Sequence, residues 1–146
     1  MARFLQETDY DMQIKSEIRR LLDGSLPTDT QPPLKLLRAE NTAISQIRNW
    51  LGNRYDCDAI FTPVGATDNR DQFIVTVTID ITLYHLYSQT GNKDVPKHRA
   101  ERYQDAVDWL QAAGKGQISA NLHMPSEEEN PGDVRIFSEP VQCHRW

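Results

Sequence analysis

The sequence lacks three features that would each point to a particular class of protein. No apolar run approaches the roughly 18 residues of a membrane-spanning helix, and the N-terminal residues have no long apolar segment of the signal-peptide kind. The two cysteines, Cys57 and Cys143, lie far apart, which disfavours a disulfide framework and favours synthesis in the cytosol. Positive charge is not in excess, since the formal net charge is −5, and this argues against a stand-alone duplex-DNA-binding protein.

Residue combinations that carry out chemistry are also missing from the sequence. The four histidines are scattered, and the adjacent pair Cys143 and His144 does not by itself make a tetrahedral metal site. Cys57 stands between Asp56 and Asp58, whose negative charges are expected to raise the thiol pKa and to disfavour a nucleophile. No glycine-rich stretch has the spacing of a phosphate-binding loop. We therefore expect no enzyme, no cofactor and no metal.

What the sequence does contain fits one small domain. Its 146 residues match the usual size of a domain, and 38% of them are hydrophobic. The mean hydropathy of −0.63 allows only a modest core. A chain this polar has either long solvated loops or a surface that is buried against a partner.

A first helix is predicted from about Thr8 to Leu22. Thr8 or Asp9 is the expected N-terminal cap, and Gly24 stands where a left-handed C-terminal cap belongs. One apolar stripe at spacings of three and four is expected to face the core: Tyr10, Ile14, Ile18, Leu21 and Leu22. Three prolines within residues 25–33 then predict a loop.

A second helix is predicted over residues 34–54, and a long exposed loop over residues 55–72. The apolar residues of this helix form one stripe: Leu36, Leu37, Ala43, Ile44, Ile47, Trp50 and Leu51. The base of the loop is expected to be stapled to the core by four apolar residues: Tyr55, Ile60, Phe61 and Val64.

A last helix is predicted over residues 95–113. Pro96 suits its first turn, Asp94 is the capping candidate, and Gly114 and Gly116 end it. Its apolar stripe contains five residues: Tyr103, Ala106, Val107, Leu110 and Ala113. Residues 119–146 have a different composition, with a glutamate triplet and several prolines, and we expect an extended arm there.

Residues 73–88 allow two interpretations. Apolar side chains alternate with threonine, aspartate and tyrosine from Phe73 to Tyr84, which is typical of a half-buried strand. The apolar run continues to Tyr87, however, and is long for a strand, so a helix buried on all sides is the other interpretation. The pattern alone favours the strand. If the segment is a buried helix, Asp80 must be paired, and Arg99 or Arg102 is the expected partner in a structural ion pair.

Several stretches, taken in order, resemble one known family. They are Phe4-Leu5, Asp9-Tyr10-Asp11, Ala39-Glu40-Asn41-Thr42-Ala43, Tyr55-Asp56, Asp80-Ile81, Leu83-Tyr84-His85-Leu86-Tyr87, Pro96, Arg102-Tyr103, Asp105-Ala106-Val107, Trp109-Leu110 and Gly114-Lys115-Gly116. Together they resemble the small head–tail connector, or adaptor, proteins of tailed bacteriophages, over residues 1–118.

The resemblance implies an all-α fold of about four helices with long loops, in which residues 73–88 are helical. It also implies a virion structural protein at the head–tail junction, made in the host cytoplasm. Such a protein forms a ring of about twelve subunits between the portal protein and the tail or stopper proteins. DNA passes through its lumen without sequence-specific binding.

In such connectors an extended terminal arm reaches the portal or a neighbouring subunit. The resemblance therefore implies a helical connector domain over residues 1–118 and an arm over residues 119–146. The expected interface residues on the arm are Arg135, Ile136, Phe137 and Trp146. The alternative function is a small cytoplasmic α-helical binding or regulatory protein.

Overall fold

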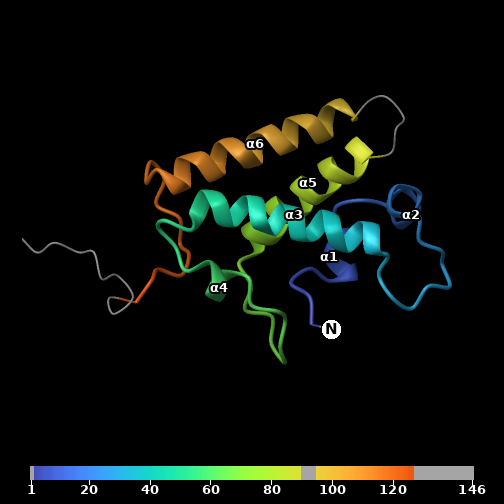
Figure 1. Cartoon of the computed structure of the whole chain (residues 1–146), viewed down its shortest axis with the longest axis horizontal. Coiled ribbons are helices and arrows are strands. Elements are labelled where there is room, and N and C mark those ends of the chain that lie inside the picture. The colour runs from blue at the N-terminus through green and yellow to red at the C-terminus, as the bar shows by residue number, and fades with distance from the viewer. Residues whose placement is uncertain (1, 90–94, 127–146) are drawn as a thin grey trace, which may run out of the picture.

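The computed structural model describes residues 2–89 and 95–126, and these residues form an all-helical structure (Figure 1). The helices are α1 (Glu7–Asp11), α2 (Ser16–Asp23), α3 (Leu34–Leu51), α4 (Cys57–Ile60), α5 (Gln72–Gln89) and α6 (Lys97–Gly114). No strand occurs within the described ranges. The predicted all-α class is confirmed. The count rises from about four to six because the first predicted helix is divided and the predicted loop contains a short helix.

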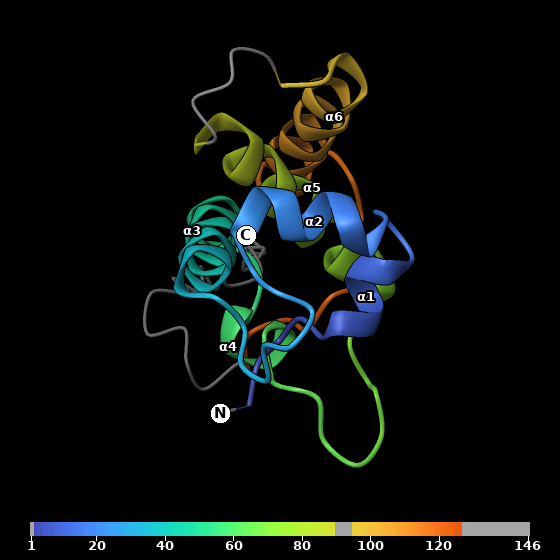
Figure 2. The same cartoon turned by 90° about the vertical axis from the view of Figure 1, so that its right-hand side faces the viewer.

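Helix α5 is the centre of the molecule. It contacts α1, α2, α3 and α6, and Figure 2 shows it enclosed by them. Ten of its eighteen residues are buried, and they lie on every side of the helix. Such a helix is apolar nearly all round because each face meets another element. The strand favoured by the alternating pattern is therefore wrong, and the helix implied by the family resemblance is confirmed.

Threonine hydroxyls make this buried helix possible. Thr78 Oγ1 donates to the Ile74 carbonyl at 2.7 Å, and Thr82 Oγ1 donates to the Thr78 carbonyl at 2.7 Å. Both threonines are fully buried, so these bonds to the preceding turn satisfy hydroxyls that would otherwise be costly to bury. The threonines that produce the strand-like alternation thus behave as apolar residues inside a helix.

The first predicted helix is broken between Met12 and Lys15. The Arg99 Nη2 atom of α6 donates to the Gln13 carbonyl at 2.9 Å, and Arg102 Nη2 donates to the Gln13 side-chain oxygen at 3.2 Å. In a continuous helix the Gln13 carbonyl would accept from residue 17 instead. A tertiary contact therefore takes the acceptor that the helix needs, and Lys15 is extended as the N-cap of α2.

The break changes which residues of the predicted stripe face the core. Tyr10, Ile14 and Leu22 are buried as predicted, but Leu21 is 83% exposed and Ile18 is 40% exposed. The predicted cap at Thr8 or Asp9 is also wrong, because α1 begins at Glu7 and Asp9 accepts from the Gln6 backbone amide at 2.7 Å. Asp9 thus closes a capping box from inside the first turn. Gly24 has φ of 76° and is the left-handed cap of α2, as predicted.

Helices α3 and α6 pack on α5 and on each other, and their predicted positions hold within a few residues. The last residue of α6, Gly114, lies so close to the Trp50 carbonyl of α3 that a Cβ atom there would overlap it. Gly116 follows in the left-handed region with φ of 75°. The predicted capping residue Asp94 lies outside the described residues.

Residues 55–72 are not a wholly exposed loop, because they contain α4. Asp56 caps this helix through bonds from the Asp58 and Ala59 amides. Tyr55, Ile60 and Phe61 are buried, as expected for the base of the loop. The chain after α6 returns to this region, where the Asp56 amide donates to the His123 carbonyl at 2.8 Å. Nearby Ala120 and Leu122 pack on the core.

Candidate functional site

The predicted ion-pair residues meet between the central helix and α6. Arg102 Nε donates to Asp80 Oδ1 at 2.9 Å, and Arg99 Nη1 lies 3.8 Å from the same oxygen. Asp80 is 6% exposed, whereas the Arg102 side chain is 45% exposed. Arg99 is buried, and its Nε atom has no hydrogen-bond partner among the residues that the structure describes. This pairing therefore neutralises a carboxylate inside the core, which is a structural role.

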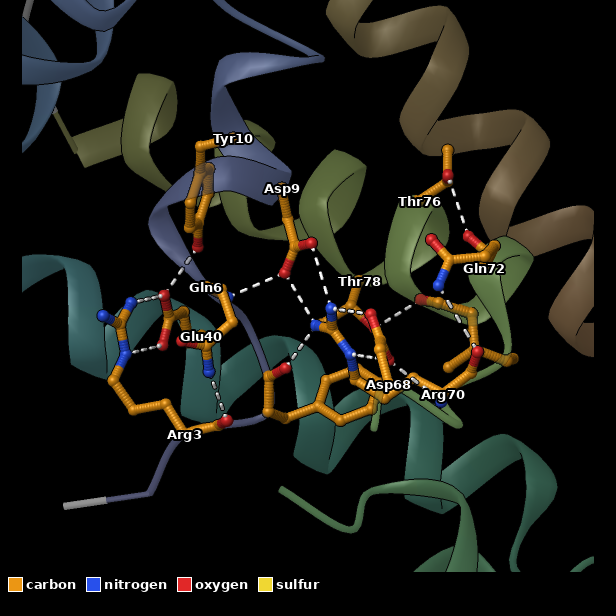
Figure 3. A network of polar contacts seen from close by, with 12 residues as sticks. Arg3, Gln6, Asp9, Tyr10, Glu40, Asp68, Arg70, Gln72, Thr76 and Thr78 are labelled. Atoms are coloured by element: carbon orange, nitrogen blue, oxygen red, sulfur yellow. Dashed lines mark hydrogen bonds and ion pairs between the residues drawn. The ribbon is translucent and has the colours of Figure 1, made fainter. Parts of the chain in front are cut away.

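A second buried charge network holds the N-terminal segment against α3 (Figure 3). The Glu40 carboxylate is buried and accepts from Tyr10 Oη at 2.7 Å and from Arg3 Nε at 3.3 Å. Arg3 Nη2 also pairs with this carboxylate. Burial, followed by the negative charge of Glu40, raises the pKa of the Tyr10 phenol well above its ordinary value.

The guanidinium of Arg70 fixes the base of the loop that precedes α5 (Figure 3). Its three nitrogens donate to both carboxylate oxygens of Asp68, to both carboxylate oxygens of Asp9, and to the Phe4 carbonyl at 2.6 Å. The hydrogen bonds from Arg70 hold the pKa of the Asp68 carboxyl below its usual range. Bidentate pairs of this kind fix orientation as well as charge. One side chain therefore joins the N-terminal segment, α1 and the loop.

Neither of these two networks was predicted from the sequence. A signal for one of them exists, because Glu40 falls in the apolar stripe of α3, four residues after Leu36 and three before Ala43. A carboxylate at a core position predicts a buried partner. No comparable signal marks Arg70, which stands in a polar loop among other charged residues and differs from them only in its tertiary contacts.

An open groove of about 880 Å³ lies beside this loop, between residues 59–71 and residues 121–123. Most of its lining is small or uncharged, including Pro63, Gly65 and Ala66. Arg70 also lines the groove, but every one of its nitrogens is already bonded within the chain. The groove therefore presents mainly backbone and uncharged side chains, and the Arg70 guanidinium is not free to bind a ligand there.

A half-buried aromatic cluster lies where α3, α5 and α6 meet. Tyr84 and Tyr103 stack with ring centroids 3.9 Å apart and an interplanar angle of 10°. Gln46 links the cluster together, since its Nε2 donates to Tyr103 Oη at 3.0 Å and its Oε1 lies 3.3 Å from His85 Nε2. Burial lowers the pKa of His85. The ring is thus shifted towards its neutral form.

The surroundings of Cys57 do not activate its thiol. Burial raises its pKa, the charge of Arg48 acts in the opposite direction, and the charges of Asp56 and Asp58 add to the increase. The predicted direction is confirmed, although burial is a larger cause than the flanking aspartates. Residues 2–89 and 95–126 contain no group of three or more histidine, cysteine, aspartate or glutamate residues that could hold a metal ion.

The other predicted site residues lie on the C-terminal arm. Arg135, Ile136, Phe137 and Trp146 are all outside the described residues. Among the helices that the structure describes, none is long and apolar enough to cross a membrane.

Comparison with known proteins gives one match. The family model described as Bacteriophage Mu, Gp36 matches residues 14–138, which is well over half of the chain. No curated protein matches the chain, and no solved structure matches it.

Proposed function

The chain belongs to the bacteriophage Mu Gp36 family, and from that premise we propose that it is a structural head–tail connector of a tailed phage. The proposed protein is an adaptor that forms a ring of about twelve subunits at the head–tail junction. The ring binds the portal protein on one side and tail or stopper proteins on the other, and its subunits are made in the host cytoplasm. The observation that carries the proposal is the family match across residues 14–138.

The geometry of the described residues supports a structural role. The two buried carboxylates, Asp80 and Glu40, are both held by arginines that join separate segments of the chain. Arg70 ties the loop to the N-terminal segment in the same way. These charges stabilise one arrangement of the helices. Our proposal assigns the protein no catalysis and no cofactor.

The C-terminal arm is the proposed contact with the portal or with a neighbouring subunit. Its residues 134–137 bring back an apolar alternation after an acidic stretch, and Trp146 supplies a large aromatic side chain. Deleting residues 133–146 should weaken assembly and leave the helical circular-dichroism signal of the domain unchanged. A truncated chain that assembles as well as the full chain would show that the arm is not the contact.

The net charge gives the proposed lumen a physical role. A charge of −5 on each chain, repeated around a ring, makes the assembly acidic and repels DNA phosphates, so the genome passes without adhering. Replacing lumen-facing acids by lysine should slow genome release from assembled particles. Ejection kinetics that do not change with these substitutions would contradict this part of the proposal.

The mass of the purified protein, alone and mixed with the portal protein of the same phage, tests the main proposal. Native mass spectrometry should show a ring of about twelve chains, formed on the portal or in its presence. A stable monomer that ignores the portal would overturn the proposal. That result would favour the alternative, a small cytoplasmic α-helical binding protein.

A further inference from the structure

Helix α3 carries an exposed face whose charged residues are cations, which we call the basic face. Its exposed positions recur at spacings of three and four, and with the half-exposed Lys35 they form this face: Leu34, Lys35, Arg38, Asn41, Thr42, Ser45, Arg48 and Asn49. The one acid of α3, Glu40, is buried on the opposite side with Arg3 and Tyr10. Arg48 pairs with Asp58 at 2.6 Å. Lys35 and Arg38 have no ion pair within the described part of the chain, so their charges are available.

Helix α6 carries an exposed face of the opposite sign, which we call the acidic face. This face contains Glu101, Gln104, Asp105 and Asp108, and the other exposed residues of α6 are Lys97, His98 and Arg102. Glu101 is 3.7 Å from Lys97, and Asp108 accepts from Gln104 at 2.8 Å. Asp105 makes no ion pair with any residue that the structure describes. The neighbouring cation, Arg102, is committed to the buried Asp80.

An exposed apolar residue belongs to the basic face, and another, on α5, packs on a tryptophan of α6. Leu34 is 64% exposed and lies one turn before Arg38. Phe73 is 50% exposed and meets the half-buried Trp109, next to Asp108, with ring centroids 4.7 Å apart. Aromatic residues are enriched in protein interfaces, and charged residues are found mainly at the polar rim around them.

The two faces cannot pair within one chain. Helices α3 and α6 pack against each other, down to the contact of Gly114 with the Trp50 carbonyl, so their exposed faces point away from that contact. Figure 2 shows the two helices on different sides of α5. Two faces that differ and complement each other make a head-to-tail contact between copies, and such a contact gives a ring when its rotation closes.

We propose that the basic face of one copy packs on the acidic face of the next copy, and that this contact repeats around the ring. The proposal rests on the ring assembly proposed above and names the surfaces that form it. Lys35 and Arg38 meet Asp105 and Asp108 across the interface, and Leu34 packs near the ring of Phe73. Because these charges are exposed, the contact weakens as salt concentration rises.

Charge reversal tests the pairing. Arg38→Glu alone, or Asp105→Arg alone, places like charges opposite each other and should raise the concentration for half-assembly by at least about tenfold. The double variant restores opposite charges and should return that concentration to within about threefold of the original. Lys15→Glu is the matched control, because Lys15 is exposed on the N-terminal side of α2, belongs to neither face and has no ion pair in the described residues.

Assembly is measured by native mass spectrometry over a concentration series with the portal protein, and circular dichroism checks that every variant keeps its helices. Rescue in the double variant supports the proposal. Single reversals that assemble like the control, in a chain that does form rings, overturn this contact and leave the connector function standing. A chain that never assembles, with or without portal, overturns both proposals.

DNA is the competing occupant of the basic face, since exposed cations also meet phosphates. A fluorescently labelled duplex titrated against the assembled ring distinguishes the two partners. Arg38→Glu rings that assemble normally but lose DNA binding would overturn the proposed contact between copies.

Discussion

Replacing Asp80 by asparagine removes a charge from the centre of the molecule and almost no volume. The carboxylate faces two cations, Arg102 Nε at 2.9 Å and Arg99 Nη1 at 3.8 Å. After the substitution, Arg99 remains buried with no carboxylate of the described residues within ion-pair distance, and it keeps its hydrogen bond to the Gln13 carbonyl. The variant therefore tests what an uncompensated buried guanidinium costs.

The size of the effect follows from the exposure of the two arginines. Breaking a buried pair by removing one partner costs about 3–5 kcal/mol. Arg102 is 45% exposed and can turn to solvent, so we expect the lower end, about 3 kcal/mol, and a melting temperature about 10 °C lower. Arg102→Ala should cost less, about 1–2 kcal/mol, because Arg99 stays near the carboxylate.

Urea unfolding followed by the helical circular-dichroism signal measures these free energies. All variants are compared at one low protein concentration, because assembly adds to apparent stability. If the slope of the unfolding free energy against urea concentration is unchanged, the variants expose the same amount of surface on unfolding. Asp11→Asn is the control, since this carboxylate is exposed and no ion pair holds it within the described residues. If Asp80→Asn and Asp11→Asn lie within about 0.5 kcal/mol of each other, the reasoning about the buried pair is refuted.

Three further substitutions test the packing, a titrating group and the loop. Gly114→Ala should destabilise the chain by about 2 kcal/mol because the added Cβ would overlap the Trp50 carbonyl. Gly65→Ala is its control, since there is open space around Gly65, and it should change the thermal midpoint little. Burial lowers the pKa of His85 in the folded chain. The free energy of unfolding should therefore fall as pH drops below about 6.5, the pKa of histidine in the unfolded chain. His85→Gln should remove that part of the pH dependence in urea titrations. Arg70→Lys cannot reproduce the bidentate contacts and should cost about 1–3 kcal/mol, with faster limited proteolysis in residues 61–69; equal cleavage rates would contradict this role.

Much of the helical framework could be predicted from the sequence. Helices α3 and α6 have apolar stripes with helical spacing, and Gly24 ends α2 because a left-handed cap favours glycine. Asp80 could also be singled out, since a carboxylate in an apolar segment requires a cation. Arg99 and Arg102 on the following helix were the partners expected from the sequence, and both lie within 4 Å of the Asp80 carboxylate.

The alternating pattern in α5 led to the wrong secondary structure. Threonine and β-branched residues favour a strand locally, and only burial by four surrounding helices makes the same residues suit a helix. The pattern favoured the strand because its apolar residues alternate with a period of two, and the burial of the segment on every side cannot be read from that alternation. The resemblance to connector proteins decided correctly for the helix.

The residue pattern predicted three helical segments, the helix end at Gly24 and a cation beside Asp80, whereas the all-helical class followed from the family resemblance. Tertiary structure alone decided where the first helix breaks, because Arg99 takes the Gln13 carbonyl from a segment far away in sequence. It also decided that the Arg70 side chain, which is 5% exposed, joins separate segments. The physical reason is the same in both cases. A local sequence pattern shows which faces of a segment are apolar. The hydrogen-bond partners of a long side chain depend on which distant elements pack beside it.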